Sequence, residues 1–90
     1  MNSAEKLRSL RDRIDVIDTE LVKLFCERMR ICESIGGLKS AGNMAVADEA
    51  RETQVLDRAA EAADIVYRSE SVALMRTVMD ISKCIQRNRQ

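Results

Sequence analysis

The stretch that decides the fold is "LRSLRDRIDVIDTELVKLFCERMRICESIGGL", residues 7–38. Its apolar residues recur at alternating steps of three and four, the spacing of one face of an α-helix. The series comprises Leu7, Leu10, Ile14, Ile17, Leu21, Leu24, Ile31, Ile35 and Leu38. Arg28 occupies the position in this series where a further aliphatic side chain is expected. The regularity predicts one continuous amphipathic helix from about Ser3, its N-cap, to about Ser40.

The remaining sequence predicts two shorter helices. A second helix is expected within residues 45–64, and Asp48 is suited to cap it. A third helix is expected at about residues 70–87, after a short connection at "IVYRSES". The inner face of the second comprises Val55, Leu56, Ala59 and Ala63, and that of the third comprises Val72, Met75, Val78, Met79, Ser82, Ile85 and Gln86. The chain has no Pro and only three Gly, one Tyr and one Phe. This composition favours an all-α fold with three helices per chain, in a single domain spanning residues 1–90.

Composition also restricts the partners. Fifteen basic residues balance fifteen acidic ones, so no global field attracts nucleic acid or an anionic membrane. The N-terminal residues contain no apolar run, so neither a signal peptide nor a membrane span is expected, and the predicted location is cytoplasmic. With no His, and with three Cys that form no paired Cys motif, neither a metal nor another cofactor is expected.

The predicted first helix is too long for a compact monomer. At ~1.5 Å per residue it extends about 55 Å, whereas a compact 90-residue domain has a radius of gyration of about 12 Å. Two shorter helices cannot cover such a rod. An intertwined homodimer is therefore favoured over a monomer.

Polar side chains interrupt the predicted apolar faces. Arg28 lies in the first series, Ser82 and Gln86 lie one turn apart in the third, and Arg11 and Lys39 lie in the heptad column beside the first. Each alone has a structural interpretation: setting register, pairing with an acid, bonding back to its own helix, or solvation. All five together favour a ligand with carboxylates, because buried charges need partners and arginine binds carboxylates bidentately.

The two arginines cannot bind one small molecule from the same chain. Arg11 and Arg28 are 17 residues apart, or about 25 Å along a helix. An antiparallel second copy, with its two-fold axis near Thr19 and Glu20, would bring its Arg11 beside Arg28. The predicted homodimer would then hold two shared sites, with Arg11 contributed across the interface.

The acidic segment "DEARETQVL", residues 48–56, allows two interpretations. Acids in a first turn are stabilised by the helix dipole, and alone that interpretation is favoured. In the functional interpretation, Glu52 faces the ligand and accepts a hydrogen bond from its hydroxyl.

Three segments resemble the all-helical class of chorismate mutases: "LRDRIDVIDTELVKLFCERMRICESIGGLKS" (residues 10–40), "VADEARETQVL" (46–56) and "MDISKCIQ" (79–86). The resemblance covers nearly the whole chain, in order. It implies an intertwined helical homodimer and an isomerase that rearranges chorismate to prephenate, the branch step toward phenylalanine and tyrosine. That reaction needs no cofactor, metal or covalent intermediate, which agrees with the absence of His.

The resemblance also implies roles for individual residues. Arg28 and the second copy's Arg11 match residues that bind the two substrate carboxylates, and Ser82 matches a further carboxylate contact. Lys39 matches a residue that contacts a carboxylate and the ether oxygen, and Gln86 matches the other ether-oxygen partner. The implied catalytic residues are thus Lys39, Gln86 and Arg28. Glu52, with Asp48 at the helix start, matches the group that receives the ring hydroxyl.

Two alternatives remain open. Isochorismate-pyruvate lyase and aminodeoxychorismate mutase are sister activities on the same fold, and their ligands differ from chorismate in one substituent or its position. A non-enzymatic helical dimerisation module would use Arg28 to set register, but it leaves Lys39, Ser82 and Gln86 unexplained as a set.

Overall fold

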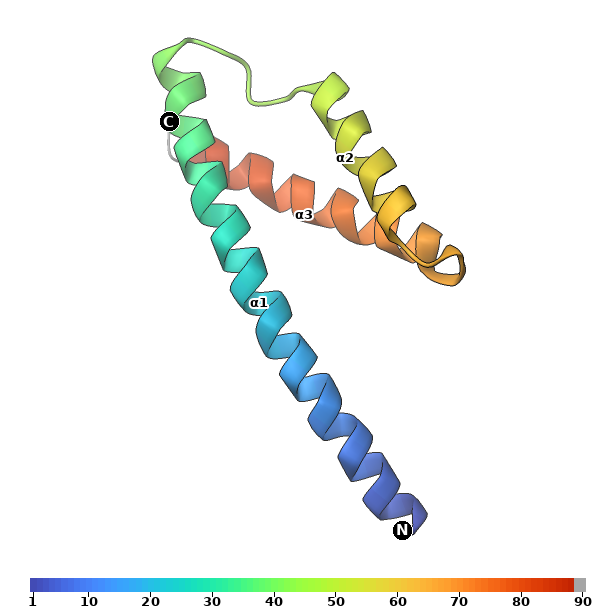
Figure 1. Cartoon of the computed structure of the whole chain (residues 1–90). Coiled ribbons are helices and arrows are strands. Elements are labelled where there is room, and N and C mark those ends of the chain that lie inside the picture. The colour runs from blue at the N-terminus through green and yellow to red at the C-terminus, as the bar shows by residue number, and fades with distance from the viewer. Residues whose placement is uncertain (89–90) are drawn as a thin grey trace. The chain divides into compact units, whose positions relative to one another are not determined.

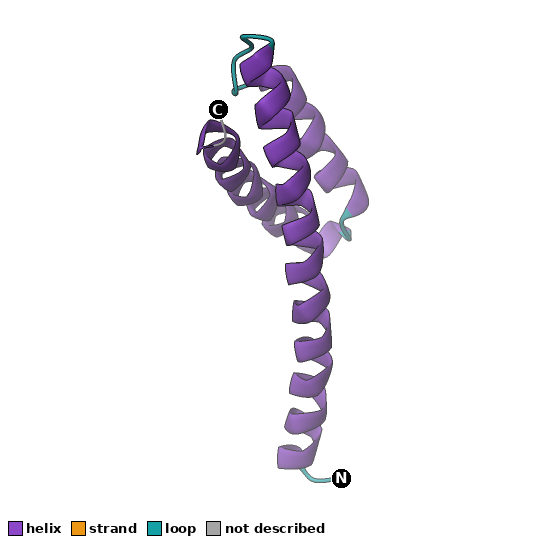
Figure 2. Cartoon of the chain, turned by 90° about the vertical axis from the view of Figure 1, so that its left-hand side faces the viewer, coloured by secondary structure: helices purple, strands orange, loops and turns teal. Residues whose placement is uncertain are grey.

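The computed structural model describes residues 1–88, and it is helical throughout apart from short connections (Figures 1 and 2). The elements are α1 (Ser3–Ala41), α2 (Glu49–Ala62), the 3-10 turn η1 (Ile65–Tyr67) and α3 (Arg68–Asn88). The predicted all-α class with three helices is confirmed for the described residues. By its internal contacts the chain divides into two units, Met1–Arg30 and Ile31–Gln90. Within the described part of the chain, no helix is long and apolar enough to cross a membrane.

The first turn of α1 is capped by Asn2, not by Ser3 as the sequence predicted. The Asn2 Oδ1 accepts from the backbone N–H of Glu5 at 2.8 Å, and the Asn2 Nδ2 donates to the Glu5 carboxylate at 3.2 Å. This reciprocal arrangement is similar to a capping box, except that the glutamate accepts from the side-chain amide of the cap residue and not from its backbone N–H. Ser3 has Lys6 three residues later and cannot form it, so Asn2 takes the cap position.

The last turn of α1 closes in a Schellman motif centred on Asn43. The Asn43 N–H donates to the Ser40 carbonyl at 3.1 Å, and the Met44 N–H donates to the Lys39 carbonyl at 2.7 Å. Asn43 has a φ of 54°, a left-handed conformation that asparagine tolerates better than most residues. The helix therefore ends within one residue of the predicted boundary, and the chain turns back toward Lys39.

The unit Met1–Arg30 exposes the apolar series predicted for the first helix. Its six aliphatic members are between 47% and 61% exposed: Leu7, Leu10, Ile14, Ile17, Leu21 and Leu24. Monomeric soluble proteins rarely expose contiguous apolar surface of this extent, and such surface usually marks an interface. The face is continuous because it follows one side of a single helix.

The unit Ile31–Gln90 is built around α3, against which α2 packs (Figure 1). Both predicted inner faces are correct: every residue named for them is buried or half-buried. The most buried side chains of α3 are Met79, Ser82 and Gln86. α3 begins at Arg68, two residues before its predicted start, because η1 leads directly into it and shortens the connection. Two polar residues therefore lie at the most protected positions of an otherwise apolar face.

Gly36 allows the C-terminal part of α1 to approach the backbone of α3 closely. A Cβ placed on Gly36 would lie 2.8 Å from the Cα and 2.8 Å from the carbonyl oxygen of Gln86. These are backbone atoms and cannot move aside independently. At Gly37 a Cβ would meet no atom within 4 Å, so only the first glycine of the pair is required by packing.

The two glycines provide a matched test of this packing. We expect Gly36→Ala to lower the free energy of unfolding by about 1–3 kcal/mol, because a side chain forced into a packed contact displaces backbone. We expect Gly37→Ala to raise it by up to about 1 kcal/mol, because alanine favours the helix. Urea unfolding followed by circular dichroism measures both. Equal stabilities of the two variants would contradict the close approach at Gly36.

Candidate active site

The centre of the candidate site is a hydrogen bond between Lys39 of α1 and Gln86 of α3. The Lys39 Nζ donates to the Gln86 Oε1 at 3.1 Å and to the backbone carbonyl of Val46 at 2.7 Å. Gln86 is 8% exposed, and Lys39 is half-buried. The Schellman motif supplies the second contact, because it folds the segment after α1 back over the lysine. Two residues that are 47 apart in the sequence are thus held together.

This hydrogen bond fixes the orientation of the Gln86 amide. A lysine ammonium carries three donors and no acceptor, so the amide atom facing it must be the oxygen. The Nε2 atom then presents its N–H groups elsewhere. Among the described residues, two acceptors account for two of the three Lys39 donors. The pair can therefore offer one ammonium N–H and an amide N–H to an acceptor atom of a ligand.

Ser82 lies one helical turn before Gln86 and is 4% exposed. Its hydroxyl donates to the Val78 carbonyl at 2.7 Å, the contact with its own helix that makes serine tolerable in a buried helical position. To donate to a ligand carboxylate, the hydroxyl would have to rotate away from Val78.

Asp48 caps α2, as its sequence position predicted. Its Oδ1 accepts from the backbone N–H of Arg51 at 3.0 Å. Glu52 follows one turn later, and its N–H donates to the Asp48 carbonyl at 3.0 Å. The cap thereby sets where α2 starts and which side of the helix Glu52 occupies.

Glu52 forms an ion pair that the sequence did not reveal. The Lys83 Nζ of α3 lies 2.6 Å from the Glu52 Oε1, with both side chains about one-quarter exposed. The hydrogen bond to Glu52 is the main cause that raises the pKa of Lys83, against a lowering by desolvation. Lys83 lies outside the apolar stripe of α3, so only the packing of α2 on α3 identifies its partner. The weak sequence signal was its position directly after Ser82.

Arg11 and Arg28 belong to α1 in the unit Met1–Arg30. Arg28 is half-buried and Arg11 is exposed. The other predicted site residues, Lys39, Asp48, Glu52, Ser82 and Gln86, all lie in the unit Ile31–Gln90. In that unit, the structure joins Lys39 directly to Gln86, while Glu52 contacts α3 through Lys83.

The chemistry of this unit is that of donors and charges held in fixed positions. Lys39 and Gln86 can stabilise negative charge on an oxygen atom, and Glu52 can accept a hydrogen bond from a hydroxyl. Such a set suits a reaction in which charge shifts within a bound ligand.

Known proteins resemble the chain over most of its length. Residues 10–87 match the model of the family described as chorismate mutase type II. A solved structure of a conserved hypothetical protein from Pyrococcus furiosus has a TM-score of 0.74 and 31% sequence identity, and the likeness covers 96% of this chain and 99% of that one.

Among curated relatives, a chorismate mutase from Methanocaldococcus jannaschii is 33% identical over 54 residues, which are 60% of this chain and 54% of that protein. A bifunctional chorismate mutase/prephenate dehydratase from Aquifex aeolicus is 35% identical over 54 residues, 60% of this chain and 15% of that protein. A 3-dehydroquinate dehydratase from Pyrobaculum aerophilum is 36% identical over 55 residues, 61% of this chain and 18% of that protein. The chain thus aligns with about half or less of each of these relatives. Since the family model matches nearly all of its described helices, the chain belongs to the chorismate mutase type II family.

Proposed function

We propose that the protein is a chorismate mutase, an isomerase that converts chorismate to prephenate on the route to phenylalanine and tyrosine. The observation that carries this proposal is the donor pair of Lys39 and Gln86, joined at 3.1 Å inside the C-terminal unit. Membership of the family and the names of two curated relatives support the same reaction.

The reaction needs an environment of this kind. In the Claisen rearrangement, the ether C–O bond breaks while a C–C bond forms in one concerted step, so no proton or electron leaves the substrate. Negative charge develops on the ether oxygen, where Lys39 and Gln86 would donate. Fixed donors stabilise such charge without reorganising during the reaction. Holding the flexible substrate in a chair-like shape supplies the remaining acceleration by orientation.

The substrate's other groups define the further roles. We assign its two carboxylates to Arg28 and to Arg11 of a second copy, with Ser82 as an additional contact and Lys39 shared with the ether oxygen. Arginine suits this task because its planar fork binds a carboxylate through two parallel hydrogen bonds. Glu52 accepts a hydrogen bond from the ring hydroxyl, and Asp48 supports Glu52 from the start of α2.

A homodimer is part of this proposal. The apolar face of α1 is about half exposed along the unit Met1–Arg30, and a second copy would cover it. Arg11 lies about 25 Å from Arg28 along a straight helix, so an antiparallel second copy is needed to complete each pair of arginines. One contact would thus bury the apolar face and assemble the site.

We expect the purified protein to consume chorismate and to release prephenate. The loss of the chorismate diene absorbance and the appearance of prephenate measure this directly. Parallel incubations with isochorismate, assayed for salicylate and pyruvate, distinguish isochorismate-pyruvate lyase activity from chorismate mutase activity. A folded protein that leaves chorismate unchanged would contradict the proposal.

Gln86→Glu tests the donor to the ether oxygen. A glutamine amide donates at every pH, whereas a carboxyl donates only while protonated, and its usual pKa is about 4.3. We expect the variant to lose about 10²-fold or more in kcat near neutral pH, as when a single oxyanion donor is removed, and to recover activity as the pH falls. The pH profile of kcat measures this.

Gln86→Ala is the matched control, because it lacks the donor at all pH values and should stay weakly active throughout. A Gln86→Glu profile parallel to that of the unchanged protein would refute the assigned role.

Subunit exchange tests the shared site. Arg11→Ala and Arg28→Ala homodimers should each be nearly inactive, because every site lacks one arginine. In a mixed dimer one site regains both arginines and the other loses both. Since about half of the dimers are mixed after random exchange, we expect about one-quarter of the original activity. No recovery after exchange proven by mass spectrometry of tagged subunits would disprove sharing.

A further inference from the structure

We propose that Lys83 is a specificity-determining residue that makes the site select a neutral hydroxyl over an ammonium group on the substrate ring. The inference rests on the proposed function, and it goes further by assigning a role to a residue outside the predicted site. Lys83 acts through Glu52, so it is a positioning residue.

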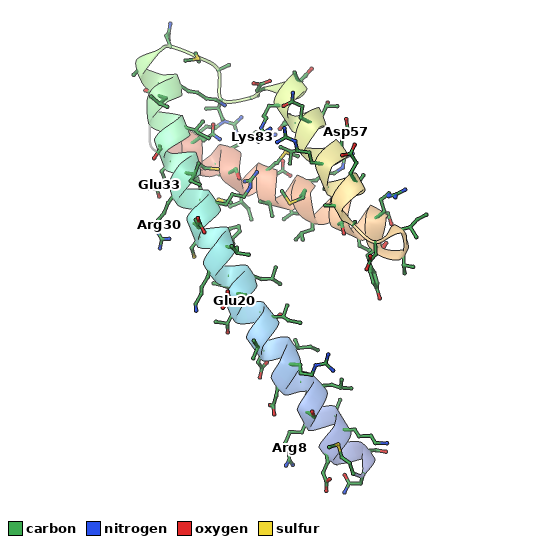
Figure 3. The ribbon with its side chains drawn as sticks, in the orientation of Figure 1. Arg8, Glu20, Arg30, Glu33, Asp57 and Lys83 are labelled. Atoms are coloured by element: carbon green, nitrogen blue, oxygen red, sulfur yellow. The ribbon has the colours of Figure 1, made fainter. Side chains whose placement is uncertain are left out.

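The geometry shows a built contact between two helices. The Lys83 Nζ lies 2.6 Å from the Glu52 Oε1, and the two side chains are 26% and 28% exposed. Lys83 projects from α3 toward α2 (Figure 3). By contrast, the pair of Lys23 and Glu20 lies within one helix at 3.6 Å with both side chains largely exposed. The interhelical pair depends on tertiary packing and is less screened by water.

The second acid near Lys83 plays a smaller part. The Asp80 carboxylate lies 3.6 Å from the Lys83 Nζ, one turn earlier on the same helix, and its side chain is 75% exposed. Because water screens such a pair, its contribution is small. Glu52 is therefore the main partner of Lys83, and Asp80 provides a natural control position.

The pair changes what Glu52 can recognise. A lone carboxylate attracts a cation more strongly than it binds a neutral hydroxyl. With Lys83 at 2.6 Å, the carboxylate charge is already balanced, and a second ammonium would be repelled by the first. A hydroxyl meets no such repulsion. A carboxylate has about four lone-pair sites, so Glu52 can accept from Lys83 and from a hydroxyl together.

The ionisation of Lys83 supports this role. Its hydrogen bond to Glu52 raises its pKa from the ordinary value of 10.5. The side chain therefore keeps its positive charge at neutral pH. An alkyl amine on a ligand ring is also protonated there, so the two cations would compete for the same carboxylate.

The experiment compares two substrates that differ in one ring substituent: chorismate, with a hydroxyl, and 4-amino-4-deoxychorismate, with an amino group. The measured quantity is kcat/KM for chorismate divided by kcat/KM for 4-amino-4-deoxychorismate, both at pH 7. We expect Lys83→Met to lower this ratio about tenfold, because removing the cation relieves the repulsion of the ammonium substrate. Lys83→Arg should keep the ratio within about threefold, since it restores the charge.

Asp80→Asn is the matched control, and it should leave the ratio unchanged. Thermal melts show whether each variant is folded. If Lys83→Met folds poorly, Lys83→Gln is used to repeat the test. A merely structural role of Lys83 would lower both kcat/KM values equally and leave their ratio constant. That result would overturn the inference about Lys83 and leave the proposed function standing. If the unchanged protein turned over neither substrate, the proposed function would fall, and the inference with it.

Discussion

The candidate site depends on the hydrogen bond from Lys39 to Gln86. It joins the last turn of α1 to the last turns of α3 at 3.1 Å, and its donor direction orients the amide, because an ammonium has no acceptor. The close approach at Gly36 places the two helices near enough for it, since a Cβ there would meet the Gln86 backbone at 2.8 Å. The Schellman turn at Asn43 adds the Val46 carbonyl as a second acceptor for Lys39. Backbone geometry thus prepares two donors before any ligand is bound.

Much of the fold follows from periodicity. The inner faces of α2 and α3 are those that the spacing of apolar residues predicted, including Ser82 and Gln86 at buried positions. The first helix ends within one residue of its expected boundary, and Asp48 caps α2. Periodicity succeeds for α2 and α3 because each packs one apolar stripe against its neighbours, and a polar residue inside such a stripe must share its environment.

The sequence predictions fail where local side-chain chemistry or tertiary packing determines a helix end or a contact. Asn2 rather than Ser3 caps α1, because the Asn2 side chain accepts from the backbone N–H of Glu5 and donates to the Glu5 carboxylate. α3 starts earlier than expected because η1 leads into it. Lys83 was missed as a site neighbour because it lies outside the apolar stripe, and its contact with Glu52 exists only after α2 has packed on α3.

Arg11 and Arg28 were predicted to meet across two chains, and their shared role remains a proposal.

The most direct measurement is a crystal structure with a stable oxabicyclic dicarboxylate ether shaped like the chair-like transition state. We expect the Lys39 Nζ and the Gln86 Nε2 both to lie about 3 Å from its ether oxygen, within hydrogen-bond distance. An analogue bound with its ether oxygen away from both groups would contradict the central claim that this donor pair stabilises the breaking C–O bond.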